Sequence, residues 1–373
     1  MHTEPHQPSW VLFLLTVALA AFGLVMVLLA SSIDGTLMHN NPYHYFMRQG
    51  IWLAVSIPFM LVAMYLPQFW LRALVYVGYP ISVILLALVP FFGTSLGMGA
   101  KRWLDVGFTT FMPSEIVKPF LIMALALVIE NLEMGIKKWK GFAKALLPLL
   151  PVVILVVTQP DLGTTIVLAG GYCIIMFIAG MRWIHTALIA AGASGALAVM
   201  LKLYPYQYER FLTWENPWRD PGGSGWQIIQ SMYAISSGGV LGLGFGNSHQ
   251  KYGYLPEPMS DFIFAIISEE FGMIGSLLVI LGFVLIFFIG VNIAMSSRNT
   301  FMSMTAMGIT IMIVLQAMIN IAVVTALIPN TGIPMPFISN GGTSLFMNML
   351  SMGILLNVSR YTVKASPMPR EPR

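Results

Sequence analysis

A few ionisable side chains lie within strongly apolar stretches, and these residues are candidates for binding or catalysis. Glu115 and Lys118 stand three residues apart in MPSEIVKPF. On a helix this spacing places both side chains on one face, where they can form an ion pair. Because burying one charge alone in hydrocarbon costs several kcal/mol, we expect the pair to face the interior of a helix bundle or a water-filled cavity.

Three further acids extend this pattern. Asp161 follows a proline in TQPDLGTT, and Asp261 opens the apolar part of LPEPMSDFIFAIISEEFG. Each aspartate can either cap a helix N-terminus or line a cavity. Glu269 lies eight residues beyond Asp261, which is about 12 Å deeper along a helix. A carboxylate at that depth must be paired, protonated or hydrated, so these acids together predict a polar cavity that opens outward.

The composition indicates the elements that must position these acids. Hydrophobic residues make up 57% of the 373 residues and charged residues 9%, whereas soluble domains are about 45–50% apolar. A membrane-spanning helix needs about 20 mainly apolar residues. We therefore predict an all-α, polytopic membrane protein with ten transmembrane helices, over residues 10–30, 51–71, 73–100, 112–129, 145–160, 162–181, 183–201, 271–297, 299–328 and 341–359.

The distribution of Lys and Arg predicts the orientation. The cluster IKKWKGFAK lies between the fourth and fifth predicted helices, and short cytoplasmic segments are enriched in such residues. Both termini are then cytoplasmic, and residues 204–261 form a large extracellular loop between helices seven and eight. We expect the stretch WQIIQSMYAISSGGVLGLG of this loop to lie along the membrane interface. Residues 1–373 form a single transmembrane domain, of which 362–373 are a short cytoplasmic tail.

Several classes of function are disfavoured. The net charge of +4 reflects the membrane topology and does not indicate nucleic-acid binding. The single cysteine, Cys173, excludes a disulfide scaffold, and no multi-ligand metal motif is visible. GGVLGLGFG resembles a dinucleotide-binding motif but lacks the preceding strand and the βαβ unit that such a motif requires.

Four stretches resemble one bacterial family, the SEDS proteins of the RodA/FtsW/SpoVE group. They are KRWLDVG…MPSEIVKP (101–119), TQPDLGT (158–164), the block from NPW to SEEFG (216–272) and LIPNTGIPMPFISNGGTSL (327–345). The resemblance runs across nearly all of the predicted helices, in the family's order and spacing, and is closest to the FtsW/SpoVE branch. The chain departs from the family's pattern at Met112, Met259, Ser260 and Asn340.

The resemblance implies a ten-helix peptidoglycan glycosyltransferase of the bacterial plasma membrane. Such proteins polymerise lipid II, a polyprenyl-pyrophosphate disaccharide-pentapeptide, and work with a class B penicillin-binding protein that cross-links the strands. Carried over by position, the family's essential aspartate is Asp261, and the charged pair of its PSE..K motif is Glu115 and Lys118, beside Ser114. The cavity would then face the outer side of the membrane, where it meets substrate and membrane lipids.

The residues suit this chemistry. The 4-hydroxyl of one sugar attacks the anomeric carbon of another, so it needs a general base, which Asp261 can supply. The pyrophosphate leaving group needs charge stabilisation more than a proton. Candidate partners for it are Lys118, Arg48, Arg102 and Arg210, while Asp161 and Glu269 shape the cavity. No cofactor is required, although Mg²⁺ or Mn²⁺ bridging Asp261 and pyrophosphate stays open.

Two other classes of function are alternatives. A lipid II flippase would need a polar path that reaches the cytoplasmic half, yet the inner halves of the predicted helices are almost purely apolar. The polar exceptions, Gln316 and Asn320, lie near the middle of a helix or further outward. A non-catalytic scaffold would have no need of buried charges. The sequence leaves open whether the protein serves cell division, elongation or sporulation.

Overall fold

The computed structural model describes residues 6–95, 101–107, 109–132, 135–203, 205–297 and 299–362, and this part of the chain is almost entirely helical. Its helices are α1 (Trp10–His39), α2 (His44–Tyr65), α3 (Gln68–Phe92), α4 (Pro113–Asn131), α5 (Trp139–Leu146), α6 (Leu149–Val157), α7 (Leu162–Ile178), α8 (Trp183–Leu203), α9 (Pro205–Glu215), α10 (Trp226–Gly238), α11 (Ile263–Ser296), α12 (Thr300–Val324) and α13 (Gly342–Ser359). Two short strands, β1 (Leu104–Asp105) and β2 (Thr110–Phe111), pair as an antiparallel hairpin. The predicted all-α class is confirmed.

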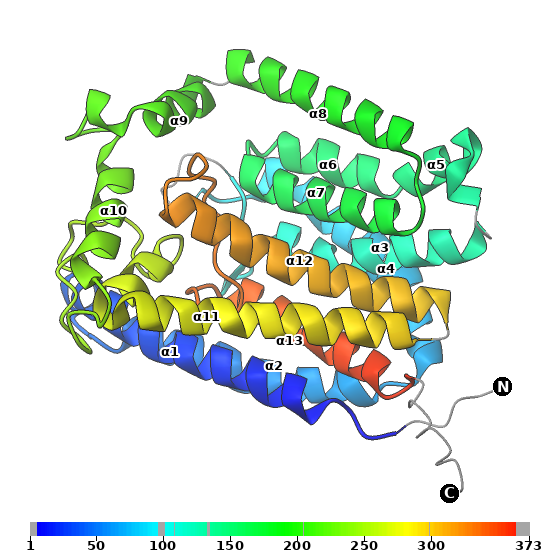
Figure 1. The fold of residues 1–373 in the computed structure, drawn as a ribbon, viewed down its shortest axis with the longest axis horizontal. Coiled ribbons are helices and arrows are strands. Elements are labelled where there is room, and N and C mark those ends of the chain that lie inside the picture. The colour runs from blue at the N-terminus through cyan, green and yellow to red at the C-terminus, as the bar shows by residue number, and fades with distance from the viewer. Residues whose placement is uncertain are drawn as a thin grey trace, which may run out of the picture.

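The long helices run side by side as a bundle (Figure 1). Helices α4, α12 and α13 occupy its interior, and most of their side chains are buried. The start of α1 and the end of α13 meet at one end, where the backbone N–H of His6 donates to the carbonyl oxygen of Arg360. Helices α9 and α10 and the start of α11 lie at the opposite end (Figure 1). Asp261 precedes the first residue of α11 by two positions, so this end is called the Asp261 end below.

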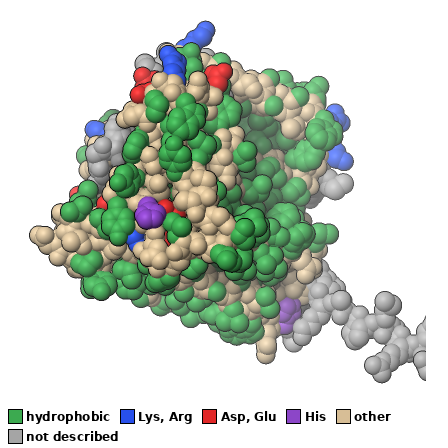
Figure 2. Space-filling view, turned by 60° about the vertical axis from the view of Figure 1, so that its left-hand side comes forward, with side chains coloured by type: hydrophobic (Ala, Val, Ile, Leu, Met, Phe, Trp, Pro, Cys, Tyr) green, Lys and Arg blue, Asp and Glu red, His purple; other side chains and the backbone are tan. Residues whose placement is uncertain are grey.

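The helices have the length and polarity of membrane spans. Five of them, α1, α2, α3, α11 and α12, are long and apolar enough to cross a membrane, and α5 with α6 forms a sixth if this pair, bent by 47°, is one broken span. Figure 2 shows an outer surface with many hydrophobic and few charged side chains. Within the described residues, each of the ten predicted segments overlaps a helix or this bent pair, and 51–71 spans the end of α2 and the start of α3. The number of membrane crossings itself stays a prediction.

Residues 204–261 contain more regular structure than a long loop. Helices α9 and α10 lie within this range. Helix α10 packs against α11, and its position relative to the membrane interface stays a prediction. Its residues Ile228, Ile229 and Ala234 are buried, and the Ser231 hydroxyl donates to the carbonyl oxygen of Val324 at 2.7 Å. The predicted C-terminal tail after residue 362 lies outside the described residues.

Helix α11 begins at Ile263, eight residues earlier than predicted, and is broken at Gly272. Gly272 has φ +64° and ψ −160°, which only glycine adopts readily. The break exposes carbonyl groups of α11, and residues 239–244 use them: the N–H groups of Leu243 and Gly244 donate to Glu269 and Glu270. A Cβ at Gly272 would lie 2.4 Å from the backbone nitrogen of Gly242.

Gly272→Ala is therefore expected to destabilise the protein. A left-handed conformation costs an alanine roughly 1–2 kcal/mol, and the clash with Gly242 adds to this cost. Gly195→Ala is the matched control, since Gly195 lies in helix α8 with open space around its Cβ position. In detergent we expect a lower melting temperature for Gly272→Ala and an equal or higher one for Gly195→Ala. Equal melting temperatures for Gly272→Ala and wild type would contradict this description of the break.

Candidate active site

Two amides of α12 hold the backbone of the Asp261 end. Gln316 and Asn320 are four residues apart, so both project from one face of the helix. The Gln316 side chain donates to the carbonyl oxygen of Pro334 at 2.9 Å. The Asn320 amide donates at 2.8 Å to the carbonyl oxygens of both Ile333 and Asp261. One side chain therefore ties the segment before α11 to the segment between α12 and α13.

A second set of contacts holds the same two segments together. The Ser339 hydroxyl donates to the carbonyl oxygen of Ser260 at 2.5 Å. The backbone N–H of Asn340 donates to the carbonyl oxygen of Met259 at 2.8 Å. From α2, Gln49 donates to the carbonyl oxygen of Ser339 and accepts from the N–H of Gly341, both at 3.2 Å. Met259 and Asn340, two positions that depart from the family pattern, are thus in direct contact.

Asp261 is held in place through its backbone carbonyl group. Its side-chain carboxylate makes no hydrogen bond within the described residues. Asp261 precedes the N-cap of α11, Phe262, and caps nothing. The helix-cap alternative for this residue is therefore wrong. Partial burial and the nearby carboxylate of Glu257 raise the pKa of Asp261 to about 6, against the opposing charges of Arg210 and Arg102. A carboxylate of this kind is suited to accept a proton near neutral pH.

Two guanidinium groups approach Asp261 from different segments. Arg102, which lies just before β1, donates to the carbonyl oxygen of Pro160 at 3.2 Å, and its Nε is 3.8 Å from a carboxylate oxygen of Asp161. Asp161 is buried and caps α7 by accepting from the N–H and hydroxyl of Thr164. Arg210 of α9 donates to the carbonyl oxygen of Asn330 at 3.0 Å. Both guanidinium groups are held by these contacts, and their charges lower the pKa of the Asp261 carboxyl.

Glu115 and Lys118 form the predicted ion pair, with 2.6 Å between the Lys118 Nζ and a Glu115 oxygen. Both are buried, and Lys118 also donates to the side-chain oxygen of Gln316 at 2.8 Å. The pair thus supports the amide that holds Pro334, one layer beneath Asp261. Ser114 is buried beside it, and neither its hydroxyl nor the second Glu115 oxygen has a hydrogen-bond partner within the described residues.

Glu269 and its neighbour Glu270 have a different role from the predicted one. The Glu269 carboxylate accepts from the Ser248 hydroxyl at 2.5 Å and from the backbone N–H of His249 at 3.0 Å. Glu270 accepts from the N–H of Gly246 at 3.1 Å and pairs with Lys251 at 3.7 Å. Both acids are buried and hold residues 246–251 against α11, so Glu269 anchors a loop and does not line the space around Asp261.

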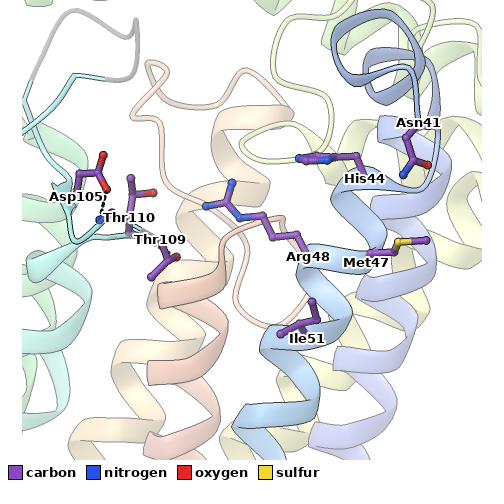
Figure 3. Close-up of a pocket in the computed structure, with 9 residues that line it drawn as sticks. Asn41, His44, Met47, Arg48, Ile51, Asp105, Thr109 and Thr110 are labelled. Atoms are coloured by element: carbon purple, nitrogen blue, oxygen red, sulfur yellow. Dashed lines mark hydrogen bonds between the residues drawn. The ribbon is translucent and has the colours of Figure 1, made fainter.

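Arg48 also lies apart from the other predicted site residues. It is exposed on α2 and lines a separate cavity (Figure 3). No role was predicted for Gln49 or Glu257, and Gln316 and Asn320 were predicted only as polar exceptions in an apolar helix. The four-residue spacing of these two was a usable signal. Within the described residues, no group of three His, Cys, Asp or Glu side chains comes together to hold a metal ion.

Comparison with known proteins agrees with this architecture. A family model for cell cycle proteins, covering FtsW, RodA and SpoVE, matches residues 9–364. Stage V sporulation protein E of Bacillus subtilis is 38% identical over 97% of this chain and 100% of its own length. A probable peptidoglycan glycosyltransferase FtsW of Coxiella burnetii is 35% identical over 95% of this chain and 96% of its own.

Two solved structures are also similar. One is a chain from a peptidoglycan synthase complex that coordinates polymerization and crosslinking, with a TM-score of 0.78, 30% identity and coverage of 95% of this chain and 98% of that one. The other is the rod shape determining protein RodA of Thermus thermophilus, with a TM-score of 0.71, 26% identity and coverage of 96% and 98%.

The buried ion pair gives a prediction about stability. Lys118→Met leaves the Glu115 charge buried without a partner, which costs about 3–5 kcal/mol. We expect a lower folded yield and melting temperature in detergent. Because the double variant Glu115→Gln, Lys118→Met removes both charges, it should recover much of the lost stability. Glu115→Gln alone is measured as well. If the losses of stability of Lys118→Met and Glu115→Gln simply add in the double variant, the pair does not interact as described.

Proposed function

This chain belongs to the FtsW, RodA and SpoVE family, and we propose that it is a peptidoglycan glycosyltransferase that polymerises lipid II. One observation carries the proposal: Asp261 presents a carboxylate that accepts no hydrogen bond within the described residues and has a pKa of about 6, and the charges of Arg210 and Arg102 act on it. A general base beside fixed positive charge is what glycosyl transfer with a diphosphate leaving group requires.

In the proposed reaction, the Asp261 carboxylate takes the proton from the 4-hydroxyl of the acceptor sugar as its oxygen attacks the anomeric carbon of the donor. The bond between that carbon and the diphosphate breaks, and the electron pair leaves with the polyprenyl diphosphate. Arg102 and Arg210 stabilise the negative charge that develops there. Attack and departure occur on opposite faces of the carbon, so its configuration inverts.

The remaining polar residues hold the backbone around Asp261 in place. The Asn320 amide fixes the backbone of Asp261, and Glu115, Lys118 and Gln316 support the facing segment from below. Lys118, predicted as a partner of the diphosphate, contacts Glu115 and Gln316 here instead. A Mg²⁺ or Mn²⁺ ion shared between the Asp261 carboxylate and the diphosphate would add to the positive charge, and it stays a prediction.

The protein is a multi-pass membrane protein, and the proposed substrate sets its orientation. Lipid II presents its sugars at the outer face of the plasma membrane, so the Asp261 end faces outward and both termini lie in the cytoplasm, as the distribution of Lys and Arg predicts. The similarity to a chain of a polymerizing and crosslinking complex supports a cross-linking partner. In this proposal the partner is a class B penicillin-binding protein.

The activity is tested with purified protein, its partner and labelled lipid II. Wild type is expected to form polymer, and Asp261→Asn is expected to lose at least about 10²-fold in rate, because an amide cannot take the hydroxyl proton. Since the Asp261 side chain makes no hydrogen bond within the described residues and burial disfavours its charged form, the melting temperature of Asp261→Asn should equal or exceed that of wild type.

Two outcomes would contradict this function. Asp261→Asn that polymerises lipid II at nearly the wild-type rate would remove Asp261 as the base. Wild-type protein in vesicles that moves labelled lipid II between leaflets, but forms no polymer with any partner, would favour the flippase alternative.

A further inference from the structure

A second polar cavity lies at the Asp261 end, between the first turns of α2 and the β1–β2 hairpin (Figure 3). It has a volume of about 560 Å³ and is called the Arg48 cavity here. The residues that line it are Asn41, His44, Met47, Arg48, Ile51, Asp105, Gly107, Thr109 and Thr110.

The part of the Arg48 cavity around the Arg48 side chain has groups that are able to bind a phosphate. The Arg48 side chain extends into the space and makes no hydrogen bond or ion pair with any described residue (Figure 3). His44 lies one helical turn before it on the same face of α2, and the hydroxyl groups of Thr109 and Thr110 lie on the facing wall. A guanidinium fork with nearby donors suits the oxygen atoms of a phosphate or diphosphate.

The remaining wall residues define where such an anion would bind. Asp105 also faces the cavity, and one of its carboxylate oxygens accepts from the N–H of Gly107 at 2.8 Å. Its negative charge repels an anion, so an anion would bind nearer to Arg48 than to Asp105. Met47 and Ile51 of α2 also line the cavity, and both side chains are more than half exposed. The cavity therefore combines polar groups around Arg48 with the exposed apolar side chains of Met47 and Ile51. This combination fits a lipid with a phosphate head group.

The Arg48 cavity is separate from Asp261 but connected to it. Gln49, the neighbour of Arg48, holds the backbone of Ser339 and Gly341, and the Ser339 hydroxyl holds Ser260. The segment 339–341 thus lies between the two. Arg102 and Arg210 influence the charge of Asp261, whereas Arg48 is not among the groups that do.

The proposed reaction needs two lipid-linked substrates whose diphosphates lie at different distances from the base. The diphosphate of the donor is bonded to the reacting carbon, so it must lie next to Asp261, where Arg102 and Arg210 are fixed. The diphosphate of the acceptor is separated from the reacting 4-hydroxyl by two sugar rings. We infer that the Arg48 cavity binds the diphosphate of the acceptor lipid, an inference that rests on the proposed function.

Two analogues of lipid II separate the substrates. A donor-only analogue carries hydrogen in place of the 4-hydroxyl, and an acceptor-only analogue carries a methylene group in place of the anomeric oxygen, so its diphosphate cannot leave. A mixture of the two gives one tetrasaccharide product per pair. The KM for each analogue is measured for wild type, for Arg48→Gln and for the control Lys101→Gln, which removes an exposed charge from the same end.

Arg48→Gln is expected to raise the KM for the acceptor-only analogue about tenfold or more, the usual effect of losing a charge-assisted hydrogen bond. The KM for the donor-only analogue should change less than about threefold, and Lys101→Gln should resemble wild type in both. An unchanged acceptor KM, or an equal rise for both analogues, would overturn the inference.

Binding without turnover distinguishes this inference from the proposed function. A fluorescent acceptor-only analogue is titrated with each variant in detergent, and Arg48→Gln should bind about tenfold more weakly than wild type. If wild type binds in this way yet forms no polymer, the proposed activity fails while the site stands. Competition by phosphatidylglycerol as effective as that by unlabelled analogue would show a general phospholipid site and would overturn the assignment to the acceptor.

Discussion

The side-chain amide of Asn320 makes two hydrogen bonds on which the geometry of the site depends. Its donors hold the carbonyl oxygens of Asp261 and Ile333, which belong to segments about 70 residues apart in sequence. Burying an amide in an apolar helix is costly, and these two hydrogen bonds offset part of that cost, while the Asn320 Oδ1 has no partner within the described residues. Because α12 is one of the most buried long helices, the amide itself is held rigidly. The base is thus positioned by its backbone, and its carboxylate remains available.

The acids that the sequence pattern singled out divide into structural and chemical groups by what satisfies their charge. Asp161 caps α7, Glu115 pairs with Lys118, and Glu269 accepts hydrogen bonds from the loop at 246–251. Asp261 has charges nearby but no hydrogen bond within the described residues. A carboxylate left unsatisfied at the mouth of a bundle is poorly explained by stability, and such groups occur mainly at functional sites. This contrast is the physical reason for assigning the chemistry to Asp261.

The sequence predicted much of this arrangement where the causes are local. Apolar length predicted the helices, and the three-residue spacing predicted the Glu115–Lys118 pair. The sequence could not decide whether Asp261 is a helix N-cap or a general base. The answer depends on the residue at which α11 begins and on the contact with Asn320, 59 residues away. Glu269 was misplaced for the same reason: its partners lie about 20 residues earlier, in a loop whose path depends on the break at Gly272. Arg48 could not be separated from Arg102 and Arg210 without tertiary structure.

The dependence of polymerisation rate on pH tests the role of Asp261 most directly. The base acts when deprotonated, and its pKa is raised to about 6, so the wild-type rate should fall as the pH drops through about 6. The Glu257 carboxylate contributes to that raised pKa, so Glu257→Gln should shift the acidic limb to lower pH while the rate at neutral pH stays similar. A wild-type rate that is constant between about pH 5 and 8, or an acidic limb that Glu257→Gln leaves unmoved, would contradict Asp261 as the general base.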